Sequence, residues 1–168
     1  MPEAASRFVA VLGAIAFSAA ALAMENDPLP APKGGPRQQA VERYNEGVQL
    51  LLAKRYGDAQ RRFEEALAHD DTLAEAHNNL AFSLRMQGKD NFERSLREYE
   101  RALALNPKLA QAYMYRGMLF TQMGDAARAQ ADLATLRTLD AGMAVKLERA
   151  IADTAREERD GIAAQLEY

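Results

Sequence analysis

A self-similarity with a period of about 34 residues constrains the fold of this chain more than any other feature. Three consecutive stretches, 40–73, 74–109 and 110–141, each carry two amphipathic helical patterns separated by a short break. The first pattern of each stretch contains a small residue at the equivalent position, where two helices have to approach closely. These small residues are Gly47, Ala81 and Gly117. The period predicts a stack of three helix pairs.

The second helical pattern of each stretch places a large apolar residue between two smaller ones, at spacings of four and three. Such spacings put all three residues on one helix face. The sets are Ala59, Phe63 and Ala66, then Ser95, Tyr99 and Ala102, then Ala129, Leu133 and Leu136. We expect each large residue to pack into the space beside the small residue of the first helix.

Residues typical of helix ends lie between these patterns. Gly88 and Gly124 stand where the first helix of a pair has to end, in the position that favours glycine. The dipeptide Asn106-Pro107 predicts a cap and a first helical residue for the third pair. Thr72 and Glu75 have the spacing of a capping box for the second pair.

Together these features resemble the tetratricopeptide repeat family over about residues 40–141. The resemblance implies an all-α, right-handed superhelix of three helix-turn-helix repeats. The chain departs from the family pattern at Arg43, where the family prefers a large apolar residue. Asp71 and Ala141 replace the proline that Pro107 supplies in the second repeat, and the turn QGKDNF carries two extra residues. None of these departures breaks the helical spacing.

The C-terminal segment, 142–168, predicts one more helix and a tail. Its apolar residues recur at spacings of three and four, and they are Met143, Leu147, Ala150 and Ile151. Asp140 is a suitable cap for that helix. We expect this helix to cover the exposed apolar side of the last repeat, near Leu133 and Leu136, because a repeat does not bury its own apolar side.

The N-terminal segment is typical of an exported protein. Residues 1–23 predict a signal peptide, because Phe8–Ala23 is uncharged and ends in Ala21-Leu22-Ala23, a small-x-small sequence that signal peptidase accepts. An uncleaved membrane anchor is the alternative. Residues 24–39 contain four of the six prolines of the chain and two glycines, so they predict an extended linker that acts as a spacer.

Composition and motifs give little indication of an enzymatic activity or of a metal or cofactor site. The chain has no cysteine, and its net charge of -3 does not indicate nucleic-acid binding. His69 and His77, with Asp70 and Asp71, suggest a metal site only loosely, because their spacing matches no compact ligand motif. No phosphate-binding loop or catalytic triad is recognisable. We therefore expect a protein without enzymatic activity, metal or cofactor.

The resemblance implies that the first helix of each repeat lines a concave groove. Asn45, Asn78, Gln111 and Gln122 fall at inward-facing positions, and the amides of Asn78, Asn79 and Gln122 suit a peptide backbone. Large and adaptable side chains occupy most of the remaining inward positions. The predicted partner-binding groove consists of Tyr44, Val48, Asn79, Phe82, Met86, Met114, Tyr115 and Met118. We expect it to bind a polypeptide, either an amphipathic helix or an extended apolar peptide.

One use of the family is to clamp the carboxylates of a chaperone tail with lysine, arginine and asparagine. The five positions that this use requires hold Tyr44, Val48, Asn79, Gln111 and Tyr115, of which only Asn79 fits. Such a clamp is therefore not expected. Three alternatives stay open: the tail of the chain fills the groove, the chain self-associates as a scaffold, or it is an accessory subunit of an enzyme. Export suggests the bacterial periplasm, and by analogy a role in envelope assembly or secretion.

Overall fold

The computed structural model describes residues 28–30 and 34–166, with side chains up to residue 156. Within these residues the chain forms seven α-helices and one short 3₁₀ helix, and no strand. The α-helices are α2 (Pro36–Leu52), α3 (Tyr56–His69), α4 (Ala74–Met86), α5 (Phe92–Leu105), α6 (Ala110–Gln122), α7 (Ala126–Leu139) and α8 (Ala141–Leu166). The predicted signal peptide and anchor alternative both lie outside the described residues.

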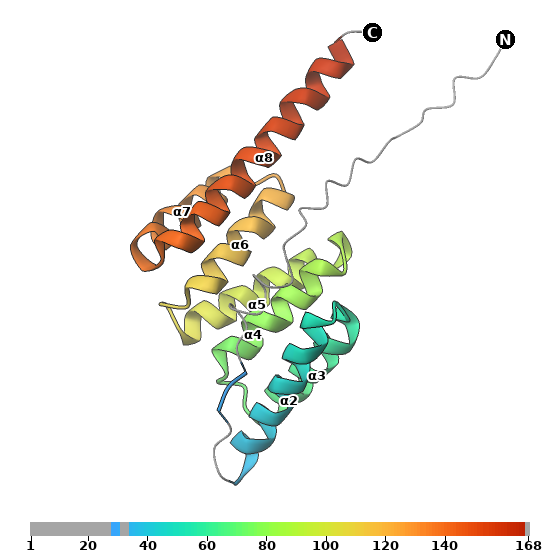
Figure 1. Ribbon diagram of the computed structural model, residues 1–168, viewed down its shortest axis with the longest axis vertical. Helices are drawn as coiled ribbons and strands as arrows, with labels where there is room; N and C mark the ends of the chain where they lie inside the picture. Colours follow the sequence, from blue (N-terminus) through green and yellow to red (C-terminus); the bar gives the residue numbers. More distant parts are fainter. Residues whose placement is uncertain (1–27, 31–33, 167–168) are drawn as a thin grey trace, which may run out of the picture.

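The helices form three antiparallel pairs that stack one after another, and α8 follows the last pair (Figure 1). Each expected repeat holds one pair, α2/α3, α4/α5 and α6/α7. The first helices α2, α4 and α6 also contact one another in sequence. The prediction of an all-α helical repeat is confirmed. One boundary differs from the expectation: α2 begins at Pro36, inside the expected linker, because proline is well suited to the first turn of a helix.

Close approach between helices depends on the predicted small and large positions. A Cβ atom added at Gly47 would lie 2.5 Å from the Phe63 ring, so the ring fills the space that the missing side chain leaves. Gly117 has a different neighbour, since its added Cβ would lie 2.5 Å from Cδ2 of Leu147 in α8. Phe63 and Leu147 are both fully buried. The expected packing of large against small residues is confirmed in the first repeat.

The turns inside the three pairs each contain one residue with a positive φ. Gly88 and Gly124 follow α4 and α6 with φ of 113° and 77°, which confirms their predicted role at helix ends. Lys54 holds the equivalent place after α2 with a φ of 58°, although it has a side chain. The two extra residues of the second repeat are accommodated by the 3₁₀ helix Lys89–Asn91.

The turns between the repeats correct two predictions. Thr72 does not cap α4, because its backbone N–H and hydroxyl both donate to Oδ1 of Asp70, at 3.0 and 2.5 Å. The Asn106 side chain likewise accepts from the N–H of Lys108 at 3.1 Å, and α6 begins only at Ala110. Both segments are turns closed by an acidic or amide side chain, which competes successfully with capping.

The last helix, α8, packs against both α6 and α7. Asp140 caps it as predicted, since its Oδ1 accepts from the N–H of Met143 at 2.9 Å. Ala144, Leu147 and Ala150 are buried on its inner face. The expected contact with α7 is therefore joined by one with α6, where Leu147 meets Gly117. Among the described helices, none is long and apolar enough to cross a membrane.

Candidate functional site

All eight residues of the predicted groove lie on the first helices of the repeats. Their exposure differs from that of an open groove: in the structure Met86 is 41% exposed, whereas Tyr115 is 1% and Phe82 is 3% exposed. The other five, which are Tyr44, Val48, Asn79, Met114 and Met118, are buried as well. Replacing these buried side chains would therefore affect stability before it affected binding, so a binding site has to include an opening in this face.

The structure brings together neighbouring members of this predicted groove. The hydroxyl of Tyr44 on α2 accepts from the Nδ2 amide of Asn79 on α4 at 3.1 Å. The rings of Phe82 on α4 and Tyr115 on α6 have centroids 4.9 Å apart. These two contacts link the three first helices into one continuous face.

Arg85 adds a cation to this face that the sequence analysis had not selected as a binding residue. Its guanidinium carbon lies 5.2 Å from the ring centroid of Phe82 and 6.0 Å from that of Tyr115. It also donates to Oε1 of Gln122 at 3.2 Å. Burial raises the pKa of the nearby Tyr99 to about 12, although the charge of Arg85 opposes this shift. Arg85 is therefore held within the packed face by aromatic and amide partners.

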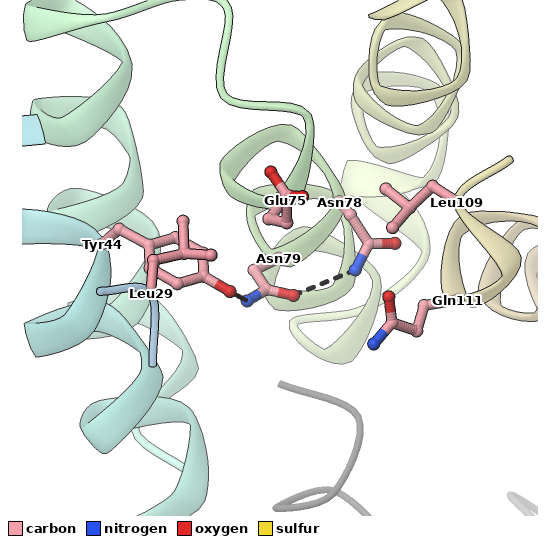
Figure 2. A pocket seen from close by; sticks show the side chains of 7 residues that line it. All are labelled: Leu29, Tyr44, Glu75, Asn78, Asn79, Leu109 and Gln111. Carbon is pink, nitrogen blue, oxygen red and sulfur yellow. Dashed lines mark hydrogen bonds between the residues drawn. The ribbon is translucent and has the colours of Figure 1, made fainter. Parts of the chain in front are cut away.

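A pocket of about 220 Å³ opens between the first and third repeats, on the same side as this face. Figure 2 shows Tyr44 and Leu29 on one side of it, Asn78 and Asn79 in the middle, and Leu109 and Gln111 on the other side. Glu75 completes the lining. Three amide side chains and one carboxylate line this pocket, and none of its lining residues is a cation. Such a lining suits a neutral polar group, for example a peptide main chain, better than an anion.

A directed chain of hydrogen bonds crosses the pocket wall. The Nδ2 amide of Asn78 donates to Oδ1 of Asn79 at 3.0 Å, and Asn79 in turn donates to Tyr44 (Figure 2). This arrangement uses one donor of Asn78 and leaves its Oδ1 buried with no hydrogen-bond partner. Because an unsatisfied buried acceptor is costly, Asn78 Oδ1 is a natural place for a donor from a bound molecule.

The pocket already contains one piece of extended chain at its edge. The backbone N–H of Leu29 donates to Oδ1 of Asn45 at 2.8 Å, and Nδ2 of Asn45 donates to the carbonyl of Leu29 at 2.9 Å. The Leu29 side chain packs against the core cluster and lines the pocket. At residues 28–30 the expected linker is thus docked onto α2, and the prediction of a simple spacer is wrong there.

Two residues of this pocket, Asn78 and Gln111, and the neighbouring Asn45 lie at predicted inward-facing positions but outside the predicted groove. The pattern that would have found them is the recurrence of amide side chains at inward positions of all three first helices. Leu29, Glu75 and Leu109 were missed as pocket residues. Leu29 lies in the proline-rich segment, which has no periodicity, so nothing in the sequence indicates its contact with α2.

The two histidines do not form a metal site with their neighbours in the structure. Nδ1 of His77 lies 2.7 Å from Oε2 of Glu98, and its Nε2 lies 3.1 Å from the carbonyl oxygen of Asp71. His77 is buried and joins α4, α5 and the preceding turn. In the part of the chain that the structure describes, no three His, Cys, Asp or Glu residues are placed to hold a metal ion.

Comparison with solved structures places this architecture among known folds. The Arabidopsis OM64 TPR domain superposes with a TM-score of 0.65 at 18% identity, over 71% of this chain and 98% of that domain. The fold is that of a tetratricopeptide repeat domain. The second TPR of Spaghetti (RPAP3), bound to the HSP90 peptide SRMEEVD, gives a TM-score of 0.58 at 22% identity, over 61% of this chain and 94% of that one.

A third similar structure is the Hsp90 co-chaperone Cns1 from Saccharomyces cerevisiae, with a TM-score of 0.67 at 21% identity. The similarity covers 80% of this chain but 45% of Cns1, so the repeat domain corresponds to less than half of that protein. No family profile and no curated protein matches the sequence. At these identities the likeness establishes the tetratricopeptide repeat fold alone.

Proposed function

We propose that this chain is an exported, non-catalytic interaction module that binds an extended polypeptide on the side formed by α2, α4 and α6. The observation that carries the proposal is the pair of hydrogen bonds that the Asn45 side chain makes with the N–H and the carbonyl of Leu29. A side-chain amide that donates to a carbonyl and accepts from an N–H of one residue recognises an extended main chain without reading its sequence.

The pocket beside this contact supports the same ligand class. Asn78 offers an unsatisfied acceptor, Gln111 adds a further amide, and Leu109 supplies an apolar wall. A similar repeat structure holds an HSP90 peptide of sequence SRMEEVD. That peptide is acidic, whereas the pocket here is lined by Glu75 and by no cation, so we propose a neutral, apolar peptide as the ligand.

Export is the second part of the proposal and rests on the sequence of residues 1–23. Signal peptidase cleavage after Ala23 would give a protein that begins at Met24 and acts in the periplasm, as an adaptor for other exported proteins. N-terminal sequencing of the protein isolated from its host tests this part. A full-length N-terminus in the membrane fraction would replace it with the anchor.

Peptide binding is tested by selecting ligands from a displayed library of random peptides with the folded protein. We expect the selected peptides to be apolar and low in charge, and their affinity to fall about five- to tenfold in the Asn78→Ala variant, as for the loss of one hydrogen bond. The matched control is Arg61→Ala, since the Arg61 side chain is 68% exposed on α3. Selected peptides that bind both variants equally would exclude this pocket as the site. A concentration-dependent dimer that selects no peptides would support the scaffold alternative.

A further inference from the structure

The segment Pro28-Leu29-Pro30 lies against the inner side of α2, and the chain has to reverse direction to bring it there. Gly34 and Gly35 both have positive φ, 86° and 81°, directly before α2 begins at Pro36. No atom lies within 4 Å of a Cβ added at either glycine, so the positions favour glycine for their backbone conformation and not for space. The N–H of Gly34 also donates to Oε1 of Gln38 at 2.6 Å, which fixes the turn on the first turn of α2.

The length of the connection fits this reversal. Asn45 lies nine residues after Pro36, which is about 13 Å along a helix. A chain of six residues, which is the separation of Pro30 and Pro36, spans up to about 20 Å when extended, and this exceeds the distance along the helix. Leu29 is therefore presented to Asn45 as a separate peptide would be.

The composition of the segment suits a ligand of such a site. Pro28 and Pro30 have fixed φ values and carry no backbone N–H, so the extended conformation is favoured before binding and little entropy is lost. Leu29 then supplies the only N–H of the three residues, and Asn45 accepts from it. The apolar Leu29 side chain packs beside the buried core.

We propose that Pro28-Leu29-Pro30 is an internal ligand that occupies one end of the peptide site, so that a partner has to displace it. This inference rests on the proposed function, because it concerns the same pocket. It specifies the ligand as an extended peptide in which an apolar residue stands between prolines or other residues that favour an extended backbone. The internal segment satisfies Asn45 but leaves Asn78 Oδ1 without a donor. A longer peptide that reaches both amides would make one hydrogen bond more than the internal segment makes.

Competition by the internal segment is governed by its effective concentration. For a short connection this is in the millimolar range, so even a millimolar contact fills the site for about half of the time. Freeing the site should therefore raise the affinity for an added peptide by about two- to tenfold. If the internal segment fills the site for more of the time, freeing the site would raise the affinity for the added peptide by more.

The contact itself is tested by amide hydrogen exchange of Leu29 in the full chain. Because both neighbours are prolines, residues 28–30 carry a single exchangeable backbone amide, and its rate reports directly on the bond to Asn45. We expect exchange at least about twofold slower than in an unstructured peptide, and full acceleration in the Asn45→Ala variant. The control is Asn91→Ala, an amide of the 3₁₀ helix that makes none of these bonds. Equal exchange in the wild-type and Asn45→Ala chains would overturn the internal ligand.

Competition is tested with the synthetic peptide NDPLPAPK, which copies residues 26–33. It should bind the Leu29→Asp chain, whose own segment is released, about two- to tenfold more tightly than the wild-type chain, and it should lose binding when Asn45→Ala is added. Equal affinity for wild type and Leu29→Asp would overturn the inference.

The peptides selected from the library separate this inference from the proposed function. If they bind the wild-type and Leu29→Asp chains equally, while Asn78→Ala weakens them, the peptide-binding function stands and the internal ligand is excluded. If the library yields no ligand but NDPLPAPK binds as expected, the internal ligand stands and the proposed function as a receptor for partners fails.

Discussion

The first and third repeats place opposite charges at the same two positions. In the first repeat Nε of Arg62 lies 3.2 Å from Oε2 of Glu46, and both side chains are about two-fifths exposed. In the third repeat Arg116 and Asp132 form the equivalent pair with the charges exchanged between the two helices, at 2.7 Å, and Asp132 is 4% exposed. The positions are equivalent because Glu46 and Arg116 precede the close-contact glycines.

The same two repeats differ in the residue that fills the space beside these glycines. Phe63 of α3 fills the space at Gly47, whereas Leu133 takes the place of Phe63 in the third repeat and Leu147 of α8 reaches Gly117. The first repeat is thus closed by its own second helix, and the third also needs α8. One repeat pattern therefore tolerates different sources of packing and either polarity of ion pair.

The large apolar residues should show the largest effects. Phe63→Ala is expected to cost about 3–5 kcal/mol of unfolding free energy, because the ring is fully buried and Gly47 leaves no side chain to fill the cavity. Leu133→Ala should cost less, about 2–4 kcal/mol, since leucine is a smaller side chain than phenylalanine and leaves a smaller cavity. Urea denaturation of both variants measures the difference. A loss below about 1 kcal/mol for Phe63→Ala would contradict the packing described here.

The loss of stability on breaking the ion pair should differ between the two repeats almost as much. Arg116→Met keeps most of the aliphatic stem but leaves the Asp132 carboxylate buried without its partner, at a cost of about 3 kcal/mol. Arg62→Met removes the exposed equivalent and should change stability by less than about 1 kcal/mol. The urea midpoints of the two variants give the comparison, and equal losses would show that burial does not distinguish the two pairs.

The pH dependence of the Arg116→Met variant sharpens this prediction. Burial raises the pKa of Asp132 in the folded protein, although the hydrogen bonds and charge of Arg116 oppose the shift. A raised carboxyl pKa means that the folded state retains a proton which the unfolded state has released. Stability from this group is therefore present below the ordinary aspartate range and is lost as pH rises through the folded pKa. Without Arg116 this loss should grow, so the variant should be closest to wild type at about pH 4 and furthest from it at neutral pH.

Substitution of the close-contact glycines should give a smaller difference in stability between the first and third repeats. An alanine Cβ at residue 47 would lie 2.5 to 2.9 Å from three atoms of the Phe63 ring, which is rigid, so Gly47→Ala should cost about 2 kcal/mol despite the better helix propensity of alanine. At Gly117 the clash is with the flexible end of Leu147, and the loss should stay below about 1 kcal/mol. Thermal melts of both variants test this. The double variant Gly47→Ala with Phe63→Leu, in which a flexible leucine replaces the rigid ring as Leu133 does in the third repeat, should recover part of the loss.

The sequence was sufficient for the fold, because the repeat is a local pattern written three times. The spacing of Ala59, Phe63 and Ala66 follows from helix geometry, and Asp140 caps α8 by accepting from the N–H of Met143, three residues later. The predicted caps at Thr72 and Asn106 are wrong. The same residues can form either a helix cap or a turn closed by a side-chain hydrogen bond, and in the structure they form the turn.

The candidate site was less predictable for a physical reason. Inward-facing positions follow from helical periodicity, but the exposure of Phe82 or Tyr115 depends on everything packed against them, which no single helix determines. The docking of Leu29 depends on one pair of hydrogen bonds to Asn45, between residues 16 positions apart, in a segment without any period. Binding of a partner at Asn45 and the neighbouring pocket stays a prediction, which the binding experiments test.

The smallest expected effect is a gain in stability at the turn of the first repeat. Lys54 has a φ of 58°, whereas Gly124 holds the equivalent place in the third repeat with a φ of 77°. A side chain in this region strains the backbone by about 1–2 kcal/mol, and glycine relieves the strain but loses more entropy on folding. Lys54→Gly should therefore stabilise the protein by about 0.5–1 kcal/mol, whereas Gly124→Ala should destabilise it by about 1 kcal/mol. Chemical denaturation resolves both changes, and a Lys54→Gly variant less stable than wild type would mean that the Lys54 side chain contributes more than its backbone costs.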